Sequence, residues 1–222
     1  MYLSETVQRY LRATGPTHDE IQAEMAAFAE REGFPIIGPD AGGLLRSMTA
    51  MTQAELVFEF GSGFGYSAYW FLQGMPDSGE IVLTEFDEDE LAMAEDFFDR
   101  AGLTDRAHFE YGDAMDTIEN YDGPFGVVLI DHQKERYADA FEAVRDDLPV
   151  GSVVVADNVL RGPIDIDDLL AYFESGDPLP DDARIQGIAD YVDTVREAPG
   201  FQTTIVPVGS GLAVTTRVHD SE

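Results

Sequence analysis

Cysteine is absent from the chain of 222 residues. Its absence excludes disulfides, thiolate metal sites and a cysteine nucleophile. Long apolar runs are also missing, since none approaches the ~20 residues that a helix needs to cross a bilayer. The charged start of the chain contains no apolar segment of the length found in signal peptides. We therefore expect a cytoplasmic protein that does not associate with membranes.

Positive charge is scarce as well. The chain has 13 lysines and arginines against 44 aspartates and glutamates, and its formal net charge is −31. Such a surface does not suit broad contact with the phosphates of a nucleic acid. The acids are spread along the sequence, which favours a solvation role in the salt-rich cytoplasm of a halophile over a patch for a basic partner.

The order of apolar patterns predicts an α/β fold in a single domain, residues 1–222. Residues 1–50 are predicted to be helical, with a Gly- and Pro-rich loop at 33–43. Residues 55–158 alternate five short apolar runs with helical patterns, which indicates a doubly wound parallel sheet with helices on both faces. The five runs are AELVFEF, GEIVLTEF, AHFEYG, FGVVLID and SVVVADN.

The pattern changes after Asn158. Residues 159–182 are polar and interrupted by glycine and proline, so we expect a mobile loop or a lid. Residues 183–222 contain a helical pattern and then two strand patterns joined by Gly-Ser-Gly, which predicts an antiparallel hairpin. With this hairpin the predicted sheet has seven strands, most of them parallel.

The residues that follow each strand are the site candidates, because ligands of open α/β sheets bind beyond the carboxyl ends of the strands. The first strand is followed by Gly61, Gly63 and Gly65, a turn in which backbone can approach a ligand. Glu85 ends the second strand and can accept hydrogen bonds from both hydroxyls of a ribose. Together these features favour a cofactor that contains adenosine.

Polar residues also follow the other three strands. Asp113 and Ala114, after the third strand, are placed to border an adenine. Asp131 ends the fourth strand, and Asp157 and Asn158 end the fifth, so we expect their oxygen atoms to lie close together. Two carboxylates and an amide form a donor set suited to Mg²⁺ or Ca²⁺. The alternative is that the Asp-Asn pair only begins a turn.

Lys134 is the only lysine of the chain and lies one turn after Asp131. A cation nearby lowers the pKa of an ammonium group and so favours a neutral amine that accepts a proton. Arginine cannot replace it, since the guanidinium stays protonated. We interpret Lys134 as a general base; the alternative is the chance survival of one surface lysine.

Seven motifs occur in order along the chain: PIIGPDAG, FEFGSGFGYSA, LTEFDED, AGLTDRAHFEYGDA, LIDHQKERY, VVADNVLRG and PVGSGLAV. With this order and spacing, the segment from about Phe34 to Val218 resembles the cation-dependent class I S-adenosylmethionine O-methyltransferases. That family includes the catechol and caffeoyl-CoA O-methyltransferases. The resemblance implies a Rossmann-like methyltransferase fold with extra N-terminal helices.

The resemblance also implies a catalytic site. Asp131, Asp157 and Asn158 would bind Mg²⁺ or another divalent cation, and Asp131 would take part in catalysis. Lys134 would be the general base, and His132 would lie beside the cofactor. The reaction would transfer a methyl group from S-adenosylmethionine to one oxygen of a vicinal diol bound to the cation.

A binding site for S-adenosylmethionine follows from the same resemblance. Gly61 and Ser67 would approach its methionine part, Glu85 would bind its ribose, and Ile37 would line the pocket. The full cofactor-binding set comprises Ile37, Glu59, Gly61, Ser67, Glu85, Asp113, Ala114, Asp131 and His132.

The acceptor stays open. Gln133 stands where the catechol enzymes have a tryptophan of the substrate wall, although a small molecule remains our expectation. A tRNA 5-hydroxyuridine is an alternative acceptor, because PII, TEFDED and DNVLRG also resemble the enzymes that methylate it. The glycine turn and Glu85 would equally serve a nicotinamide-dependent oxidoreductase, and a third alternative is a cofactor-binding protein without catalysis. Relatives often pair through their N-terminal helices, so we expect a homodimer.

Overall fold

The described residues of the computed structural model, 4–162 and 164–219, are built around a seven-stranded β-sheet. The strands are β1 (Leu56–Phe60), β2 (Glu80–Glu85), β3 (Ala107–Tyr111), β4 (Val127–Ile130), β5 (Val153–Ala156), β6 (Phe201–Val206) and β7 (Leu212–Arg217). Their order across the sheet is β3-β2-β1-β4-β5-β7-β6. Strands β1 to β5 are parallel, and β7 is antiparallel to its neighbours β5 and β6. The predicted mostly parallel sheet with a C-terminal hairpin is confirmed.

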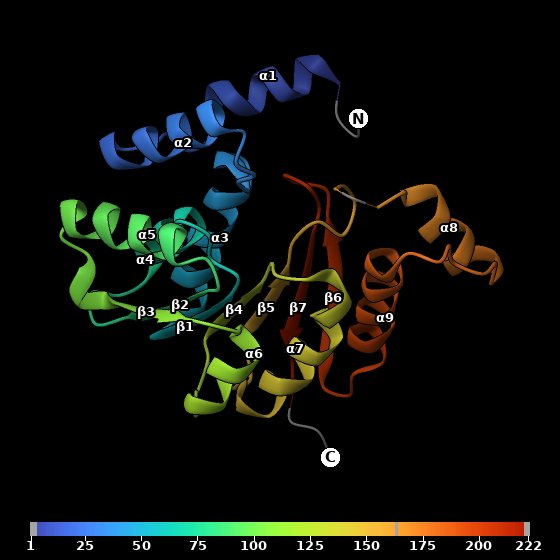
Figure 1. Cartoon of the computed structure of the whole chain (residues 1–222). Helices are drawn as coiled ribbons and strands as arrows, with labels where there is room; N and C mark the ends of the chain where they lie inside the picture. The colour runs from blue at the N-terminus through green and yellow to red at the C-terminus, as the bar shows by residue number, and fades with distance from the viewer. Residues whose placement is uncertain (1–3, 163, 220–222) are drawn as a thin grey trace.

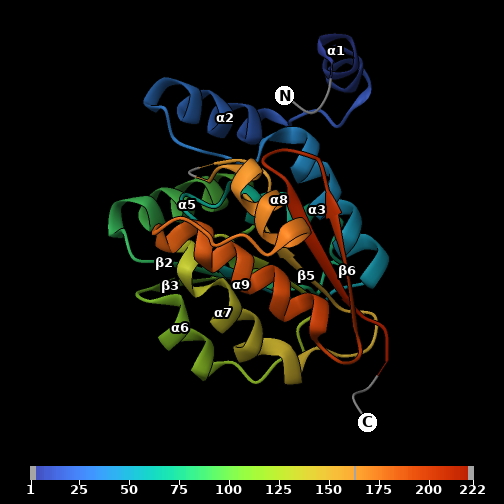
Figure 2. The same ribbon diagram turned by 90° about the vertical axis from the view of Figure 1, so that its right-hand side faces the viewer.

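Helices cover both faces of this sheet (Figure 1). The α-helices are α1 (Glu5–Thr14), α2 (Glu20–Glu32), α3 (Gly38–Thr52), α4 (Tyr66–Gly74), α5 (Glu88–Ala101), α6 (Ala114–Thr117), α7 (Tyr137–Val144), α8 (Ile166–Ser175) and α9 (Ala183–Glu197). Short 3₁₀ turns are η1 (Thr104–Arg106), η2 (Ile118–Asn120), η3 (Lys134–Arg136) and η4 (Arg145–Asp147). Figure 2 shows α7 and α9 side by side in front of the sheet, where they are in contact.

Strands β4 and β5 are apolar at every position because both of their faces are buried. In β4, Leu129 belongs to the core cluster formed with α3, α4 and α5, whereas Val128 belongs to the cluster formed with α6, α7 and α9. The same alternation occurs in β5, at Val155 and Val154. Continuous apolar runs are typical of strands buried between two layers of helices.

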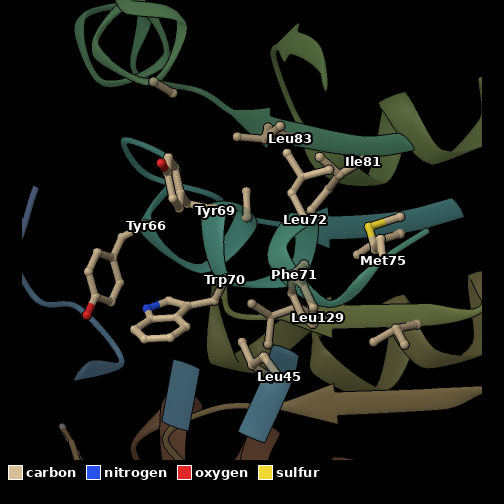
Figure 3. Packing of buried hydrophobic residues seen from close by; sticks show 14 of the residues in the cluster. Leu45, Tyr66, Tyr69, Trp70, Phe71, Leu72, Met75, Ile81, Leu83 and Leu129 are labelled. Atoms are coloured by element: carbon tan, nitrogen blue, oxygen red, sulfur yellow. The ribbon is translucent and has the colours of Figure 1, made fainter. Parts of the chain in front are cut away.

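Trp70 fixes α4 against α3 on one face. Figure 3 shows its indole ring in the core beside Leu45 and Leu129, and the side chain is fully buried. Gly42 permits this approach, because a Cβ atom there would lie 2.4 Å from the Trp70 ring. The packing sets the position of α4, whose first turn carries Ser67 at the carboxyl edge of the sheet.

Helix α3 begins earlier than the sequence predicted. The expected loop at 33–43 ends at Ile37, and residues from Gly38 onward are helical. Pro39 lies in the first turn of α3, where a missing N–H is harmless because no helical acceptor is available for it. Glycine and proline were therefore wrongly taken as evidence against a helix.

The expected loop at 159–182 also contains a helix, α8. Asp165 caps it by accepting a hydrogen bond from the N–H of Asp167 at 3.0 Å, and Gly176 ends it in the left-handed conformation at φ 71°. The loop prediction was wrong across 166–175, because acidic residues in a first turn favour a helix through its dipole. Pro163 lies outside the described residues, and a lid function stays a prediction.

Within the described part of the chain, no helix combines the length and apolarity of a membrane span.

Candidate active site

A cavity of about 600 Å³ opens at the carboxyl edge of the sheet. Every predicted site residue except Glu59 contributes to its wall. These wall residues are Ile37, Gly61, Ser67, Glu85, Asp113, Ala114, Asp131, His132, Lys134, Asp157 and Asn158. The sheet thus brings together residues that are separated by up to 121 positions in the chain, between Ile37 and Asn158.

The turn between β1 and α4 brings bare backbone to the cavity wall. Gly61, Gly63 and Gly65 have φ values of 84°, 51° and 82°, which glycine adopts without the strain that a Cβ atom would add. A Cβ atom at Gly61 would also lie 3.0 Å from the carbonyl oxygen of Asp131. The turn therefore needs glycine both for its conformation and for its approach to the end of β4.

Glu85 is held in one orientation by backbone N–H groups. Its Oε2 atom accepts a hydrogen bond from Gly63 at 2.9 Å. Its Oε1 atom accepts from Phe86 at 2.9 Å and from Asp87 at 3.1 Å. The carboxylate is thereby a fixed acceptor at the cavity wall, with lone pairs left for a ligand.

Glu59 lies behind the wall rather than in it. Its side chain is fully buried on β1, and neither carboxyl oxygen makes a hydrogen bond of ordinary geometry among the described residues. Burial raises the pKa of Glu59 to about 8; Ser67 opposes this increase, and the charge of Asp131 adds to it. Direct contact with a cofactor stays a prediction for this residue.

Asp131 and Asp157 are neighbours at the ends of β4 and β5. The parallel register pairs Ile130 with Ala156, so the next residue on each strand is an aspartate. Burial and the charge of Asp131 raise the pKa of Asp157 to about 7. Asp131 is 27% exposed, and removal from water raises its pKa while the charge of Lys134 opposes that increase. The two acids thus carry charge that the interior disfavours.

Asn158 completes this group in an unusual backbone conformation. Its φ of 64° lies in the left-handed region, which few residues other than glycine adopt. Its N–H donates to Oδ1 of Asp157 at 2.7 Å, and its side-chain Nδ2 donates to Oδ2 of Asp157 at 3.4 Å. Strained conformations of this kind persist where the surrounding structure enforces them, often at functional sites.

Lys134 begins η3 and points its amine at Asp131. The Nζ atom donates a hydrogen bond to Oδ1 of Asp131 at 2.9 Å, and the lysine side chain is only 11% exposed. The same Nζ atom donates to the hydroxyl of Tyr137. A buried amine that is paired with a carboxylate at the wall of a cavity is a candidate for proton transfer.

His132 and Asp113 border another part of the cavity. Burial lowers the pKa of His132 to about 4, so the ring is neutral near pH 7. Neither of its ring nitrogens has a hydrogen-bond partner among the described residues. Asp113 forms an ion pair with Arg136 at 2.6 Å, and this contact lowers the pKa of Asp113.

The oxygen donors of Asp131, Asp157 and Asn158 fit a hard divalent cation. The negative charge of Asp131 raises the pKa of Asp157 and so disfavours its ionised form. A bound divalent cation would offset that negative charge. In the described part of the chain, no group of three or more His, Cys, Asp or Glu side chains forms a metal cluster. The side-chain amide of Asn158 is the third oxygen donor that the strand ends offer.

Several cavity residues were not identified from the sequence. Phe86 and Tyr111 line the cavity with 69% and 63% of their surface exposed. Glu90 faces the same cavity, and burial followed by the charges of Glu85 and Asp87 raises its pKa to about 7. Phe86 directly follows Glu85, so its position after a strand was the signal that could have found it.

Comparison with known proteins gives consistent results. Residues 17–218 match the family model described as O-methyltransferase. A catechol O-methyltransferase of Niastella koreensis is 34% identical over 71% of this chain and 74% of its own length. A catechol O-methyltransferase of Mycobacterium tuberculosis is 31% identical over 70% and 72%. The O-methyltransferase of Bacillus cereus, solved in complex with SAH, matches 96% of this chain and 97% of its own with a TM-score of 0.81 and 25% identity.

Proposed function

The chain belongs to the S-adenosylmethionine-dependent O-methyltransferase family, and from this premise we propose that it methylates one hydroxyl of a vicinal-diol, catechol-like small molecule with the help of Mg²⁺ or another divalent cation. The observation that carries this proposal is the convergence of Asp131, Asp157, Asn158 and Lys134 on one cavity. Two similar proteins named catechol O-methyltransferase support the acceptor class.

The cofactor would occupy the part of the cavity between the glycine turn and Asp113. Glu85, fixed by three backbone N–H groups, is suited to accept hydrogen bonds from two ribose hydroxyls. The bare backbone at Gly61 and the hydroxyl of Ser67 suit the methionine part. When bound, S-adenosylmethionine supplies an activated methyl group on a sulfonium.

Asp131, Asp157 and Asn158 would hold the cation through oxygen atoms. The cation, when bound, supplies positive charge that favours the ionised form of an acceptor hydroxyl. Lys134 then has the position to receive the hydroxyl proton at Nζ, because its amine lies at the same wall, 2.9 Å from Asp131. His132, neutral near pH 7 and buried, helps to exclude water. Holding both reactants in one cavity supplies much of the acceleration.

The test is methyl transfer from S-adenosylmethionine carrying a labelled methyl group. We expect transfer to catechol and not to phenol, which lacks the second oxygen for the cation, and we expect loss of transfer after chelation. Bulk tRNA serves as the alternative acceptor in the same assay. Transfer to phenol at the same rate, or transfer to tRNA alone, would contradict the proposed acceptor class.

A further inference from the structure

Tyr137 touches the catalytic group without lining the cavity. It begins α7, three residues after Lys134, and its side chain is fully buried. Its hydroxyl accepts a hydrogen bond from Nζ of Lys134. The same hydroxyl lies 3.3 Å from Oδ1 of Asp131 and 3.2 Å from the carbonyl oxygen of Asp157. One oxygen atom thus contacts the base and both acidic strand ends.

The available protons define how these contacts are made. The amine of Lys134 donates two hydrogen bonds, to Asp131 and to Tyr137. A neutral amine has two N–H donors for these contacts and one lone pair that can receive the acceptor proton. The hydroxyl of Tyr137 has one proton, which it can donate either to the carbonyl of Asp157 or to Oδ1 of Asp131. The first arrangement joins the start of α7 to the end of β5, and the second joins it to the end of β4.

We propose that Tyr137 is a positioning residue that anchors the amine of Lys134 beside the cation site. This inference rests on the proposed function, in which that amine receives the acceptor proton. A lysine side chain has four rotatable bonds, whereas a tyrosine has two and is a more rigid anchor. Without the hydroxyl, the amine would keep its contact with the face of the ring, 4.7 Å from the centroid, but its only remaining side-chain hydrogen bond among the described residues would be to Asp131, which is also needed for the cation.

Packing holds the Tyr137 ring in place. The ring stacks on His132 at an interplanar angle of 10° and meets the ring of Tyr191 edge-on at 82°, each with centroids 5.7 Å apart. Helix α9 packs closely against η3. A Cβ atom at Gly187 of α9 would lie only 2.4 Å from the carbonyl oxygen of Lys134. The hydroxyl is therefore a fixed point to which the lysine chain is attached.

The single lysine makes the anchor directly observable. Growth on [¹³Cε]lysine labels Lys134 alone, because no other lysine is present. In Tyr137→Phe we expect its NMR signal to move toward that of a free, mobile lysine side chain. Tyr191→Phe is the matched control, because it also removes a hydroxyl from a buried ring that contacts Tyr137. The hydroxyl of Tyr191 lies near Thr215 rather than Lys134. The signal should stay in place in this variant.

Kinetics on catechol give the second readout. We expect Tyr137→Phe to lower kcat about tenfold or more. The KM for S-adenosylmethionine and the affinity for it measured by calorimetry should stay unchanged. Retained affinity would also show that the variant is folded. An unmoved lysine signal in Tyr137→Phe, or equal effects in both variants, would overturn the anchor. The NMR measurement needs no acceptor, so an absence of turnover in the wild-type protein would instead contradict the proposed function.

Discussion

Replacing Glu59 by glutamine should stabilise the metal-free protein most at high pH. The carboxyl is fully buried, and its pKa is raised from 4.5 to about 8, chiefly by burial. Between these two pH values the unfolded chain has released the proton, whereas the folded chain retains it. The free energy of unfolding of the wild-type protein therefore falls as pH rises through this window. Glutamine cannot ionise, so the variant does not show this decrease.

The size of the effect follows from the two pKa values. Each pKa unit corresponds to about 1.4 kcal/mol, so the ionised carboxylate destabilises the fold by about 5 kcal/mol above pH 8. Between about pH 5 and about pH 8.5, the advantage of Glu59→Gln over the wild-type protein should grow by about 4 kcal/mol. A buried amide adds its own hydrogen-bonding penalty, but that penalty does not change with pH.

The assay is urea unfolding of both proteins at several pH values with chelator present. Glu95→Gln, at an exposed position of α5, is the matched control for loss of one negative charge from this acidic chain. We expect no comparable growth of its stability advantage with pH. A constant difference between Glu59→Gln and the wild-type protein would refute the claim that burial keeps this carboxyl protonated.

Three other substitutions test the site. Lys134→Arg should lower kcat about a hundredfold or more with cofactor affinity retained, because a guanidinium keeps its proton and cannot act as a base. An unchanged kcat would contradict the role of Lys134 as the base. Asp157→Asn should raise the Mg²⁺ concentration for half-maximal activity more than tenfold, and an unchanged value would remove Asp157 from the cation site. Gly187→Ala should destabilise the fold by about 1–3 kcal/mol and lower kcat, since its Cβ would lie 2.4 Å from the Lys134 carbonyl oxygen; unfolding and turnover measurements check both.

The sheet and the strand-end residues could be predicted because their signals are local. Continuous apolar runs identified β4 and β5 as central parallel strands, and parallel strands end at a common edge. This reasoning placed Asp131 beside Asp157, and the register between Ile130 and Ala156 agrees with it. The glycines of the turn after β1 were found because only glycine adopts their positive φ values easily.

The remaining features depend on packing between distant segments. Gly187 lies more than fifty residues after Lys134 in the chain, and only the crossing of α9 over η3 shows why it must be glycine. In the sequence, Glu59 is one acid among many, and only the structure shows that it is fully buried beside Ser67 of α4. Helix α8 was missed although Asp165 and Gly176 stand where a helix cap and a helix end are expected.

We propose that Asp131, Asp157 and Asn158 hold a cation required for methyl transfer. The most direct measurement is the rate of catechol methylation by wild-type protein after removal of divalent ions with a chelator, followed by addition of excess Mg²⁺. We expect chelation to abolish transfer while S-adenosylmethionine still binds, and we expect Mg²⁺ to restore the rate. An undiminished rate in the chelated protein would contradict it.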